Sequence, residues 1–411
     1  MKTLQIIVTI AWRNLWRNKV RSGVVVLAMT MGIWACIFLA GFSVGMNDQR
    51  TDSALSTYVG FAQVHANGWE DERSVELLIP NLEEVIAKSQ EIPGYVAHAS
   101  RLVETGMAAS SYGALGVQVQ GVDPAMDTLV YDLQTRLIEG EFLPESRRVP
   151  RAYVGESLAE ELKLEVGSKF QVTLQDVSGY ATQALFRVGG IFKTVSSQYD
   201  KSTILIRRED MAGLIGVDPS AAHEIVYKIS SKEQAIVWAG ELSSAFPNAE
   251  VMSWKEVSPE LGYADDMMAT SLYIFIGIII MAISFGILNT MLMAILERRR
   301  ELGMLMAVGM NKRRTFFMVM IETIFLGAVG APIGILVGHL SLIWSGVNGF
   351  DLSSVGEGLN AYGMDAIVYP SAVPEYYLGI AVIVVVMTLL FSLYPAYKSI
   401  RLNPVQAIRS V

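Results

Sequence analysis

Cysteine is nearly absent from this chain of 411 residues, so no internal disulfide can form. Every folded part must therefore be held together by packing and hydrogen bonds. The single cysteine, Cys36, lies in a long uncharged run, where the string IWAC raises the question of a lipoprotein cleavage site. Trp34 is bulky where such sites carry a small residue, and the run is longer than a signal sequence needs. We expect this run to remain in the protein as a membrane helix.

Motifs that carry out chemistry are also missing. No G-x-x-x-x-G-K-[ST] string occurs, so the sequence has no P-loop to hold the phosphates of ATP. The histidines are far apart, without HExxH or paired-ligand spacing: His65, His98, His223 and His339. The string Gly155-Glu156-Ser157 resembles a nucleophile elbow only in its Gly-x-Ser, and a structural turn explains it better. We expect no catalytic residue, no metal site and no cofactor in this chain, and no enzymatic activity of its own.

Long apolar runs dominate what is present. The chain is 52% hydrophobic, with a mean hydropathy of +0.39. A bilayer core of ~30 Å takes roughly 20 helical residues to cross, and four runs are long enough. They are residues 22–46, 267–296, 315–349 and 376–397. The sequence therefore predicts an α-helical membrane protein with four transmembrane helices and one large insert, 47–266, between the first and the second.

Basic residues collect on one side of these runs and acidic residues on the other. Residues 1–21 carry five Lys or Arg and no acid, whereas the 350–375 loop carries four Asp or Glu and no base. Lys/Arg bias of this kind sets membrane orientation. Both termini (1–21 and 398–411) and the 297–314 loop should be cytoplasmic, and the insert and the 350–375 loop periplasmic. The insert has 18 Lys or Arg against 33 Asp or Glu, which argues against nucleic acid as a partner.

The N-terminal segment, 1–21, has the pattern of a helix lying in the cytoplasmic interface. Apolar residues share one face, with Trp12 and Trp16 beside it and basic residues behind. The face consists of Leu4, Ile7, Ala11 and Leu15. Indole rings at the level of the headgroups are typical of such helices. A solvated N-terminal arm is the alternative.

The insert has two alternating characters. From residue 47 to about 136, and again from about 207 to 266, strand-like alternation flanks helical patterns such as 81–90 and 232–244. Between about 137 and 206, short β-like runs are separated by glycines, which is typical of a small, strongly bent sheet. The sequence predicts an α+β domain, with an α/β base formed by both ends of the insert and a β-rich subdomain projecting from it.

The loop 297–314, ERRRELGMLMAVGMNKRR, combines a short amphipathic helix with two basic clusters. Leu302, Leu305, Met306 and Gly309 recur at i, i+3, i+4 and i+7, which places them on one helical face. A solvated turn that anchors two helices at the lipid headgroups is one interpretation. A docking surface for a partner protein is the other.

This loop resembles the ERRREfG…RAlGm…rr segment of the FtsX-like permeases, the membrane subunits of ABC transporters that include the LolC/LolE and MacB groups. The likeness extends to AWRNLWRNKVRS near the N-terminus, to IEGEFL, VGESLAEELKLEVGSKFQVTLQD and FRVGGIFKT in the insert, and to the closing YPAYKSIRLNPVQAIRS. In that family the loop is a coupling helix that docks in a groove of the ATPase subunit. The resemblance implies ATPase-coupling roles for Glu297, Arg298, Arg299, Arg300, Glu301, Leu302, Gly303, Leu305, Met306, Gly309, Arg313 and Arg314.

The resemblance also implies partners and a substrate class. Two copies of an ABC ATPase subunit would bind ATP and Mg²⁺, and a second permease subunit, identical or homologous, would complete a dimer in the bacterial inner (cytoplasmic) membrane. Lipoprotein release, with a possible periplasmic carrier, is the first interpretation, because only about 21 residues precede the first run, where MacB-type pumps carry a nucleotide-binding domain. A MacB-type efflux permease for peptides or drugs is the alternative. An FtsX-like regulator of a cell-wall hydrolase is the second alternative.

Two features inside the apolar runs indicate helix packing. Gly330, Gly334 and Gly338 form a doubled small-xxx-small pattern that lets helix backbones approach closely. Glu322 is an acid within a run, and an intramembrane carboxylate is a functional candidate by default. We favour a packing role in which Glu322 turns inward and pairs with Arg or Lys at the cytoplasmic rim; the family has a Glu at this place in its IExxxLGxxG pattern.

A lipoprotein's acyl chains lie in the outer leaflet, so a site that extracts them should be apolar and near the periplasmic ends of the first two runs. Met and Phe suit mobile acyl chains because their side chains are adaptable and apolar. The candidates for substrate and lipid contact are Phe38, Phe42, Met46, Met268, Leu272, Phe275 and Ile276. For each residue, contact with bulk lipid or with the dimer partner is the alternative.

Overall fold

The computed structural model describes residues 8–13, 17, 19–145, 149–361 and 363–401, and the chain divides into two compact units. One unit is helical and draws on Met1–Met46, Met267–Asp351 and Val368–Val411. The other holds the insert, Asn47–Asp266, together with Leu352–Ile367. The predicted 350–375 loop is therefore divided, because its central part belongs with the insert.

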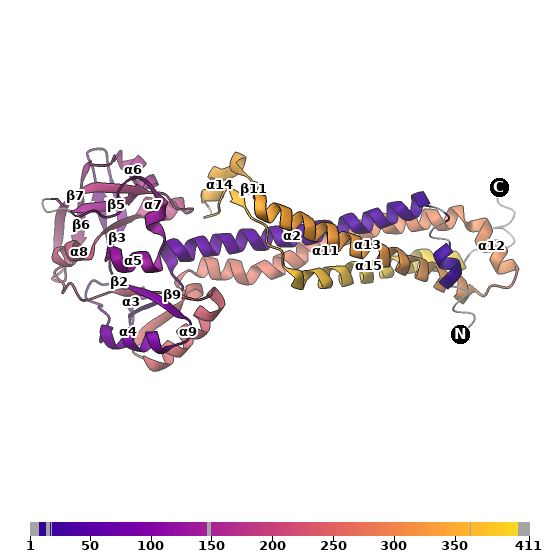
Figure 1. The fold of residues 1–411 in the computed structure, drawn as a ribbon, viewed down its shortest axis with the longest axis horizontal. Coiled ribbons are helices and arrows are strands. Elements are labelled where there is room, and N and C mark those ends of the chain that lie inside the picture. The colour runs from indigo at the N-terminus through magenta and orange to yellow at the C-terminus, as the bar shows by residue number, and fades with distance from the viewer. Residues whose placement is uncertain (1–7, 14–16, 18, 146–148, 362, 402–411) are drawn as a thin grey trace. The chain divides into compact units, whose positions relative to one another are not determined.

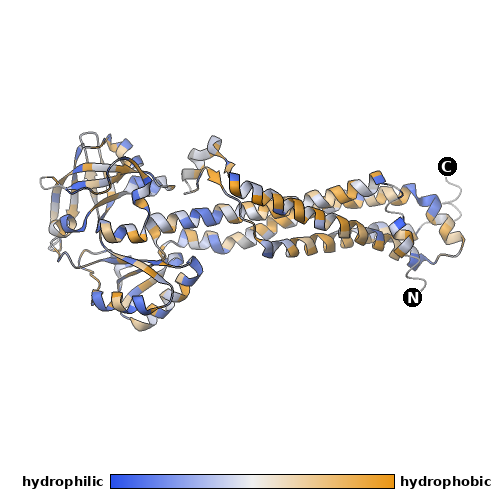
Figure 2. Cartoon of the chain, viewed as in Figure 1, coloured by the Kyte–Doolittle hydropathy of each residue, from blue (hydrophilic) through white to orange (hydrophobic). Residues whose placement is uncertain are grey.

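Among the described residues, four helices are long and apolar enough to cross a membrane, as the sequence predicts. They are α2 (Lys19–Ala54), α11 (Pro259–Glu297), α13 (Lys312–Asn348) and α15 (Pro374–Ile400). These helices lie side by side in the helical unit, and hydrophobic side chains cover most of their length (Figure 1, Figure 2).

All four helices are longer than the apolar runs that predict them, and α2 and α11 extend furthest beyond those runs. α11 has 39 residues, so it is roughly 58 Å long at 1.5 Å per residue, against ~30 Å for the bilayer core. α2 continues past residue 46 and passes into a π-helical turn, Leu55–Val59, that ends at Gly60. Hydropathy identifies only the apolar part of a helix. The polar helical turns after residue 46 and before residue 267 are not apolar, so hydropathy does not predict that the helices continue through them.

Of the N-terminal segment, the structure describes residues 8–13, which are helical, and Arg17, Lys19, Val20 and the backbone of Arg21. Ala11 is fully buried in the core of the helical unit, and the Trp12 ring contacts Phe325 of α13 edge-on at 5.3 Å. Leu4, Ile7, Leu15 and Trp16 of the predicted interfacial face, and tail residues 402–411, lie outside the described residues. The part that is described packs on the bundle, which a freely solvated arm would not do.

The described part of the insert forms a mixed sheet of ten strands in the order β10-β1-β9-β2-β3-β8-β5-β7-β4, with β6 pairing with β2 and β7. The strands are β1 (Ala62–Ala66), β2 (Tyr95–Ala109), β3 (Ala114–Val122), β4 (Leu137–Gly140), β5 (Arg151–Gly155), β6 (Lys169–Gln175), β7 (Ala181–Phe192), β8 (Thr203–Arg207), β9 (Glu224–Ile229) and β10 (Ala249–Ser253). The pairs β3–β8 and β5–β7 are parallel and the other pairs antiparallel. The α+β class predicted for the insert is confirmed.

Short helices cover this sheet. They are α3 (Trp69–Glu72), α4 (Leu82–Glu91), α5 (Pro124–Val130), α6 (Glu156–Leu162), α7 (Ser197–Ser202), α8 (Arg208–Ile215), α9 (Lys232–Ala245) and α10 (Trp254–Val257), with 3-10 turns at Leu133–Arg136 and Ser353–Val355. The 350–375 region adds β11 (Phe350–Asp351), α14 (Gly356–Ala361) and β12 (Ile367–Val368). The helices α4 and α9 lie where the sequence predicts helices at 81–90 and 232–244.

The predicted boundary between base and β-rich subdomain is wrong. The first half of β2 pairs with β9, but its second half pairs with β3 and β6. Leu102 and Ala108 of β2, Val117 of β3 and Met211 of α8 share one core with the strands from 151 to 206. The β-rich part therefore includes residues predicted for the base, because the single 15-residue strand β2 runs from one core into the other.

Candidate functional site

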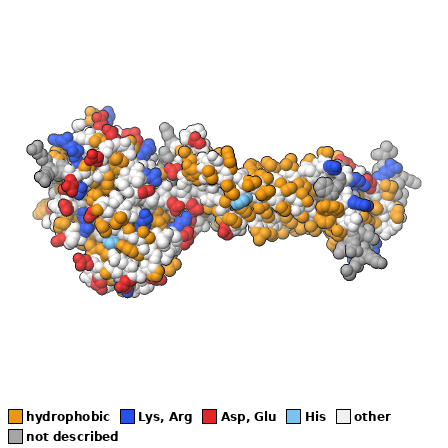
Figure 3. Space-filling model, in the orientation of Figure 1, with side chains coloured by type: hydrophobic (Ala, Val, Ile, Leu, Met, Phe, Trp, Pro, Cys, Tyr) orange, Lys and Arg blue, Asp and Glu red, His pale blue; other side chains and the backbone are white. Residues whose placement is uncertain are grey.

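A short helix joins α11 to α13 at one end of the helical unit, where basic side chains gather (Figure 1, Figure 3). This helix, α12, spans Arg299–Ala307. Gly309 follows it with a φ of 105°, a left-handed conformation that glycine adopts without strain. The Asn311 side chain then caps α13 by accepting a hydrogen bond from the backbone N–H of Arg313 at 3.3 Å. Gly309 and Asn311 therefore form the turn that separates α12 from α13.

Arg298 is the centre of an ion-pair network at the start of α12. Its Nη1 donates to both carboxylate oxygens of Glu322 on α13, at 3.2 Å each, and its Nε donates to Glu301 Oε2 at 3.4 Å. Arg17 donates to the same oxygen of Glu301. The side chains of Arg298 and Glu322 are only 17% and 15% exposed, so their charges are largely removed from water.

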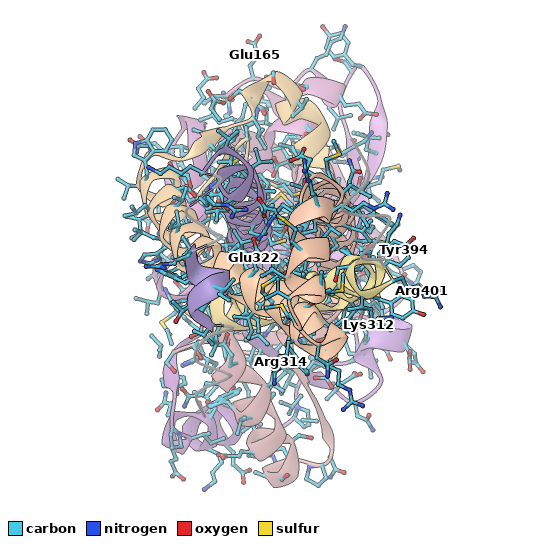
Figure 4. The ribbon with its side chains drawn as sticks, turned by 90° about the vertical axis from the view of Figure 1, so that its right-hand side faces the viewer. Glu165, Lys312, Arg314, Glu322, Tyr394 and Arg401 are labelled. Carbon is cyan, nitrogen blue, oxygen red and sulfur yellow. The ribbon has the colours of Figure 1, made fainter. Side chains whose placement is uncertain are left out.

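Viewed from the α12 end, Glu322 lies among the helices, whereas Arg314 and Arg401 are at the periphery (Figure 4). Glu322 therefore has a basic partner at the end of the bundle, the pairing that the sequence analysis favours. Burial works to raise the pKa of Glu301, but Arg17 and Arg298 outweigh it and hold that pKa below its ordinary value. Glu301 is thus an anion between two cations at neutral pH.

The apolar face of α12 packs onto the bundle. Leu302 is 2% exposed and belongs to the core that contains Ile295 of α11 and Met318 of α13. Gly303 is buried, and Leu305 and Met306 are half-buried. The prediction of an outward docking face is therefore wrong for Leu302, because helical periodicity shows which residues share a face but not which neighbour covers it.

The outward surface of α12 and of the residue that follows it lies outside the predicted apolar face. Val308 is 90% exposed and Met304 is 47% exposed. Met304 is two positions from Leu302, which puts it on the opposite side of the helix. This spacing in the sequence could have predicted that Met304 faces outward when Leu302 is buried. Of the other predicted coupling residues, Glu297, Arg300, Gly309, Arg313 and Arg314 are exposed, and Arg299 is half-buried.

The predicted helix-packing glycines lie against α2. A Cβ on Gly334 would stand 2.8 Å from the Cβ of Ile33, and Cβ atoms on Gly330 and Gly338 would stand 3.1 Å from Met29 and 2.9 Å from Ile37. At Gly334 and Gly338 a neighbouring atom would have to shift to admit a Cβ, and at Gly330 the contact would be tighter than usual. Thr30 Oγ1 also donates a hydrogen bond to the carbonyl of Gly330 at 3.3 Å. The stripe thus sets the closest approach of α13 to α2.

The residues predicted to contact lipid separate into two groups. Leu272 and Ile276 are 4% and 2% exposed inside the helical unit, so for them the prediction of an accessible lipid rim is wrong. Phe275 is 58% exposed, and Met46 and Met268 are half-buried. Phe38 stacks on Phe42 with ring centroids 6.3 Å apart, and both rings contact Phe350. The residues of α11 are apolar on every face of the helix. Its sequence therefore has no periodic pattern that separates buried residues from exposed ones.

Two family models match this chain. The model described as the MacB-like periplasmic core domain matches residues 22–236, and the FtsX-like permease C-terminal model matches residues 273–404. The first covers more than half of the chain, and the second covers α12, α13 and α15 with most of α11.

The relatives that align with nearly the whole chain include a lipoprotein-releasing protein and a macrolide-export protein. The lipoprotein-releasing system transmembrane protein LolC of Haemophilus influenzae is 22% identical over 393 residues, which is 93% of this chain and 92% of the relative. The macrolide export ATP-binding/permease protein MacB of Bdellovibrio bacteriovorus is 23% identical over 430 residues, and the chain spans 97% of its own length but only 60% of that relative.

Among solved structures, the periplasmic region of MacB from Actinobacillus actinomycetemcomitans matches with 13% identity and a TM-score of 0.34, over 51% of this chain and 95% of that one. The family assignment rests on the two sequence models. With four membrane-spanning candidates and a periplasmic core domain between the first and the second, the chain belongs to the FtsX-like permeases of ABC transporters.

Proposed function

We propose that this chain couples a separate ATPase subunit to its own periplasmic domain, with α12 as the element that receives the motion. The observation that carries the proposal is the double attachment of α12. Leu302 fixes the helix to the core of the bundle, and Arg298 ties its start to Glu322 on α13. A push on the exposed surface around Met304 and Val308 is then transmitted to the membrane helices, because the helix cannot slide independently.

The partners follow from this proposal. Two ATPase subunits bind ATP and Mg²⁺, each docking on the α12 of one permease subunit, and a second permease, identical or homologous, completes the dimer. The membrane is the bacterial inner membrane, with α12 on the cytoplasmic side. The basic residues 298–300 and 312–314 around α12 support that side, since Lys and Arg are retained there.

Within this function we propose lipoprotein release as the substrate class. The support is the match to a lipoprotein-releasing LolC protein along 92% of that relative, and the exposed apolar Phe275 and Met267 near the start of the apolar part of α11. The MacB relative, which is named for macrolide export, favours efflux of a drug or a peptide in place of lipoprotein release. The chemistry of the captured molecule distinguishes the two.

A charge on the outer surface of α12 tests the coupling. We expect Val308→Asp to weaken ATPase binding at least tenfold, equivalent to about 1.4 kcal/mol, since the new carboxylate would have to be desolvated on docking. The measurement is co-purification with the ATPase subunit and ATP-dependent transport in vesicles. Val237→Asp, at a 63% exposed valine on α9, is the matched control and should leave both unchanged. Full ATPase retention by Val308→Asp would contradict the proposal.

A photo-crosslinking residue at position 275 tests the substrate. We expect it to capture an acylated lipoprotein, with ATP reducing the yield, because the exposed ring is accessible to acyl chains that enter from the membrane. The same residue at position 272, which is 4% exposed, should give far less adduct. Capture of a drug or an unacylated peptide would reject lipoprotein release in favour of efflux.

A further inference from the structure

The insert contains a polar pocket of about 200 Å³ that has no part in the coupling proposal. Its wall is drawn from distant parts of the sequence, including Gln63 of β1, Trp69 of α3, Gln118 of β3, Tyr199 of α7 and Glu224 of β9. The volume is enough for a small group such as an alkylammonium or one amino-acid side chain.

Glu224 is the buried charge of this pocket. It is 7% exposed and lies on β9 between His65 of β1 and Arg101 of β2, its partners in the sheet register. Neither neighbour donates a hydrogen bond to it, and the hydrogen bonds that both make go to other residues. His65 Nε2 lies 2.9 Å from Gln63 Oε1, and its Nδ1 lies 3.1 Å from the carbonyl oxygen of His223.

The Arg101 guanidinium donates its hydrogen bonds to Asp127 and Gln120. Its Nε and Nη2 donate to Asp127 Oδ1 at 2.8 and 2.5 Å, and its Nη1 donates to Gln120 Oε1 at 3.1 Å. Across the residues that the structure describes, no donor is placed on the Glu224 carboxylate. A largely buried carboxylate that lacks a protein donor is costly, and it takes its donor from water or from a ligand that enters the pocket.

The charges around the pocket leave a negative balance once Glu224 is ionised. The buried groups are Arg101, Asp127 and Glu224, one cation and two acids, and burial lowers the pKa of His65 to about 4, so His65 is neutral. At the mouth, Arg73 Nη2 donates to Glu70 Oε1 at 2.5 Å, and that pair cancels.

A second unsatisfied group lies in the same pocket. The hydroxyl of Tyr199 is buried and has no hydrogen-bond partner among the described residues. The Tyr199 ring stacks on Tyr58, another residue of the wall, at 4.7 Å, which gives an apolar surface for an alkyl stem. A carboxylate and a hydroxyl that can both accept, beside an aromatic surface, match a group with several N–H donors on an aliphatic chain.

We propose that this pocket binds an organic ammonium group, from a free amine or from a lysine side chain of an exported polypeptide, with Glu224 as its anionic partner. The ammonium donates to the Glu224 carboxylate and to the Tyr199 hydroxyl, and its methylene stem lies on the tyrosine rings. The site is independent of the coupling proposal, because binding is measured without the ATPase subunit.

The pH dependence follows from the groups that face Glu224. Burial raises the pKa of Glu224 to about 7; Arg101 and Arg73 act to lower it, and Asp127 and Glu70 act to raise it. His65 is neutral, and burial keeps the pKa of Tyr199 well above its ordinary value. Because only the ionised carboxylate binds a cation, affinity rises with pH and is about tenfold stronger at pH 8 than at pH 6.

The test is isothermal titration calorimetry of the full chain in detergent, with spermidine and with an N-terminally acetylated, lysine-containing tripeptide as probes. We expect binding of at least one amine, a tenfold gain from pH 6 to pH 8, and a loss of at least tenfold in Glu224→Gln. The same tripeptide with an acetylated lysine should not bind. Tighter binding of spermidine identifies a free amine as the source, and tighter binding of the tripeptide identifies a polypeptide.

Two variants control for folding. Glu224→Asp keeps the charge and should retain pH-dependent binding with reduced affinity, whereas Glu165→Gln makes the same charge change at an exposed glutamate and should bind like the wild type. Equal binding of the tripeptide with an acetylated lysine, wild-type affinity in Glu224→Gln, or no binding of either amine would overturn the proposal.

Discussion

At the residue scale, the pair of Arg298 and Glu322 differs from the ion pairs on the surface of the insert. Both side chains are mostly buried, and Arg298 also reaches Glu301. A surface pair such as Lys88 and Glu91 has a shorter separation of 2.7 Å but side chains that are 51% and 67% exposed. Desolvation, not distance, decides how much such a contact matters, because water and salt screen an exposed pair.

Removal of one partner leaves the other charge buried and uncompensated. We expect Glu322→Gln to lower the free energy of unfolding by about 1–3 kcal/mol, below the full cost of breaking a buried pair because Arg298 keeps Glu301. Thermal unfolding in detergent measures this change. The double variant Arg298→Met/Glu322→Leu should recover most of the stability but not the coupling to the ATPase.

Glu91→Gln is the control for this prediction, since its exposed pair should contribute within about 0.5 kcal/mol. If Glu322→Gln unfolds at the wild-type temperature and transports normally, the pair has no structural role.

The sequence could predict the partner of Glu322 but not the pocket around Glu224. Glu322 is an acid in an apolar run close to a basic loop, so burial cost and charge alone point to an arginine or lysine. The neighbours of Glu224 come from β1 and β2, and only the sheet register brings His65 and Arg101 beside it. No periodicity or motif in the sequence specifies that register.

At the element scale, the approach of α13 to α2 depends on the absence of side chains at three glycines. We expect Gly334→Ala to destabilise the helical unit by about 1–3 kcal/mol, since its Cβ would stand 2.8 Å from the Ile33 Cβ and 3.0 Å from the Thr30 carbonyl oxygen. Thermal unfolding measures the change. Gly379→Ala on α15, where a Cβ meets nothing within 4 Å, should be neutral or stabilising.

Equal stability of these two alanine variants would mean that the helices separate without cost. The small-xxx-small spacing predicts close packing but not the partner helix, because any neighbouring helix could fill that groove. The same limit applies to α12. Its apolar stripe was visible in the sequence, yet whether the stripe meets the bundle or another protein depends on the ends of α11 and α13.

At the scale of the whole molecule, the sequence predicts the order of membrane helices and insert because hydropathy and charge act locally. It does not predict how the insert divides, since the single strand β2 contributes residues to more than one core and pairs with β9, β3 and β6. Long-range pairing of this kind has no local signature. The family match then adds what neither hydropathy nor pattern gives, namely that the insert resembles the MacB-like periplasmic core domain.

The orientation of the chain can be measured directly with two single cysteines. Ser178 is exposed in the insert, and Lys312 is exposed at the start of α13, where it leaves the capping residue Asn311 intact. Cys36 is fully buried, so an impermeant maleimide should give little background. We expect Ser178→Cys to react in intact spheroplasts and Lys312→Cys to react only after permeabilisation, since basic residues are retained in the cytoplasm. Labelling of Lys312→Cys in intact spheroplasts, with Ser178→Cys protected, would place α12 on the wrong side of the membrane for an ATPase and would reject the coupling proposal with it.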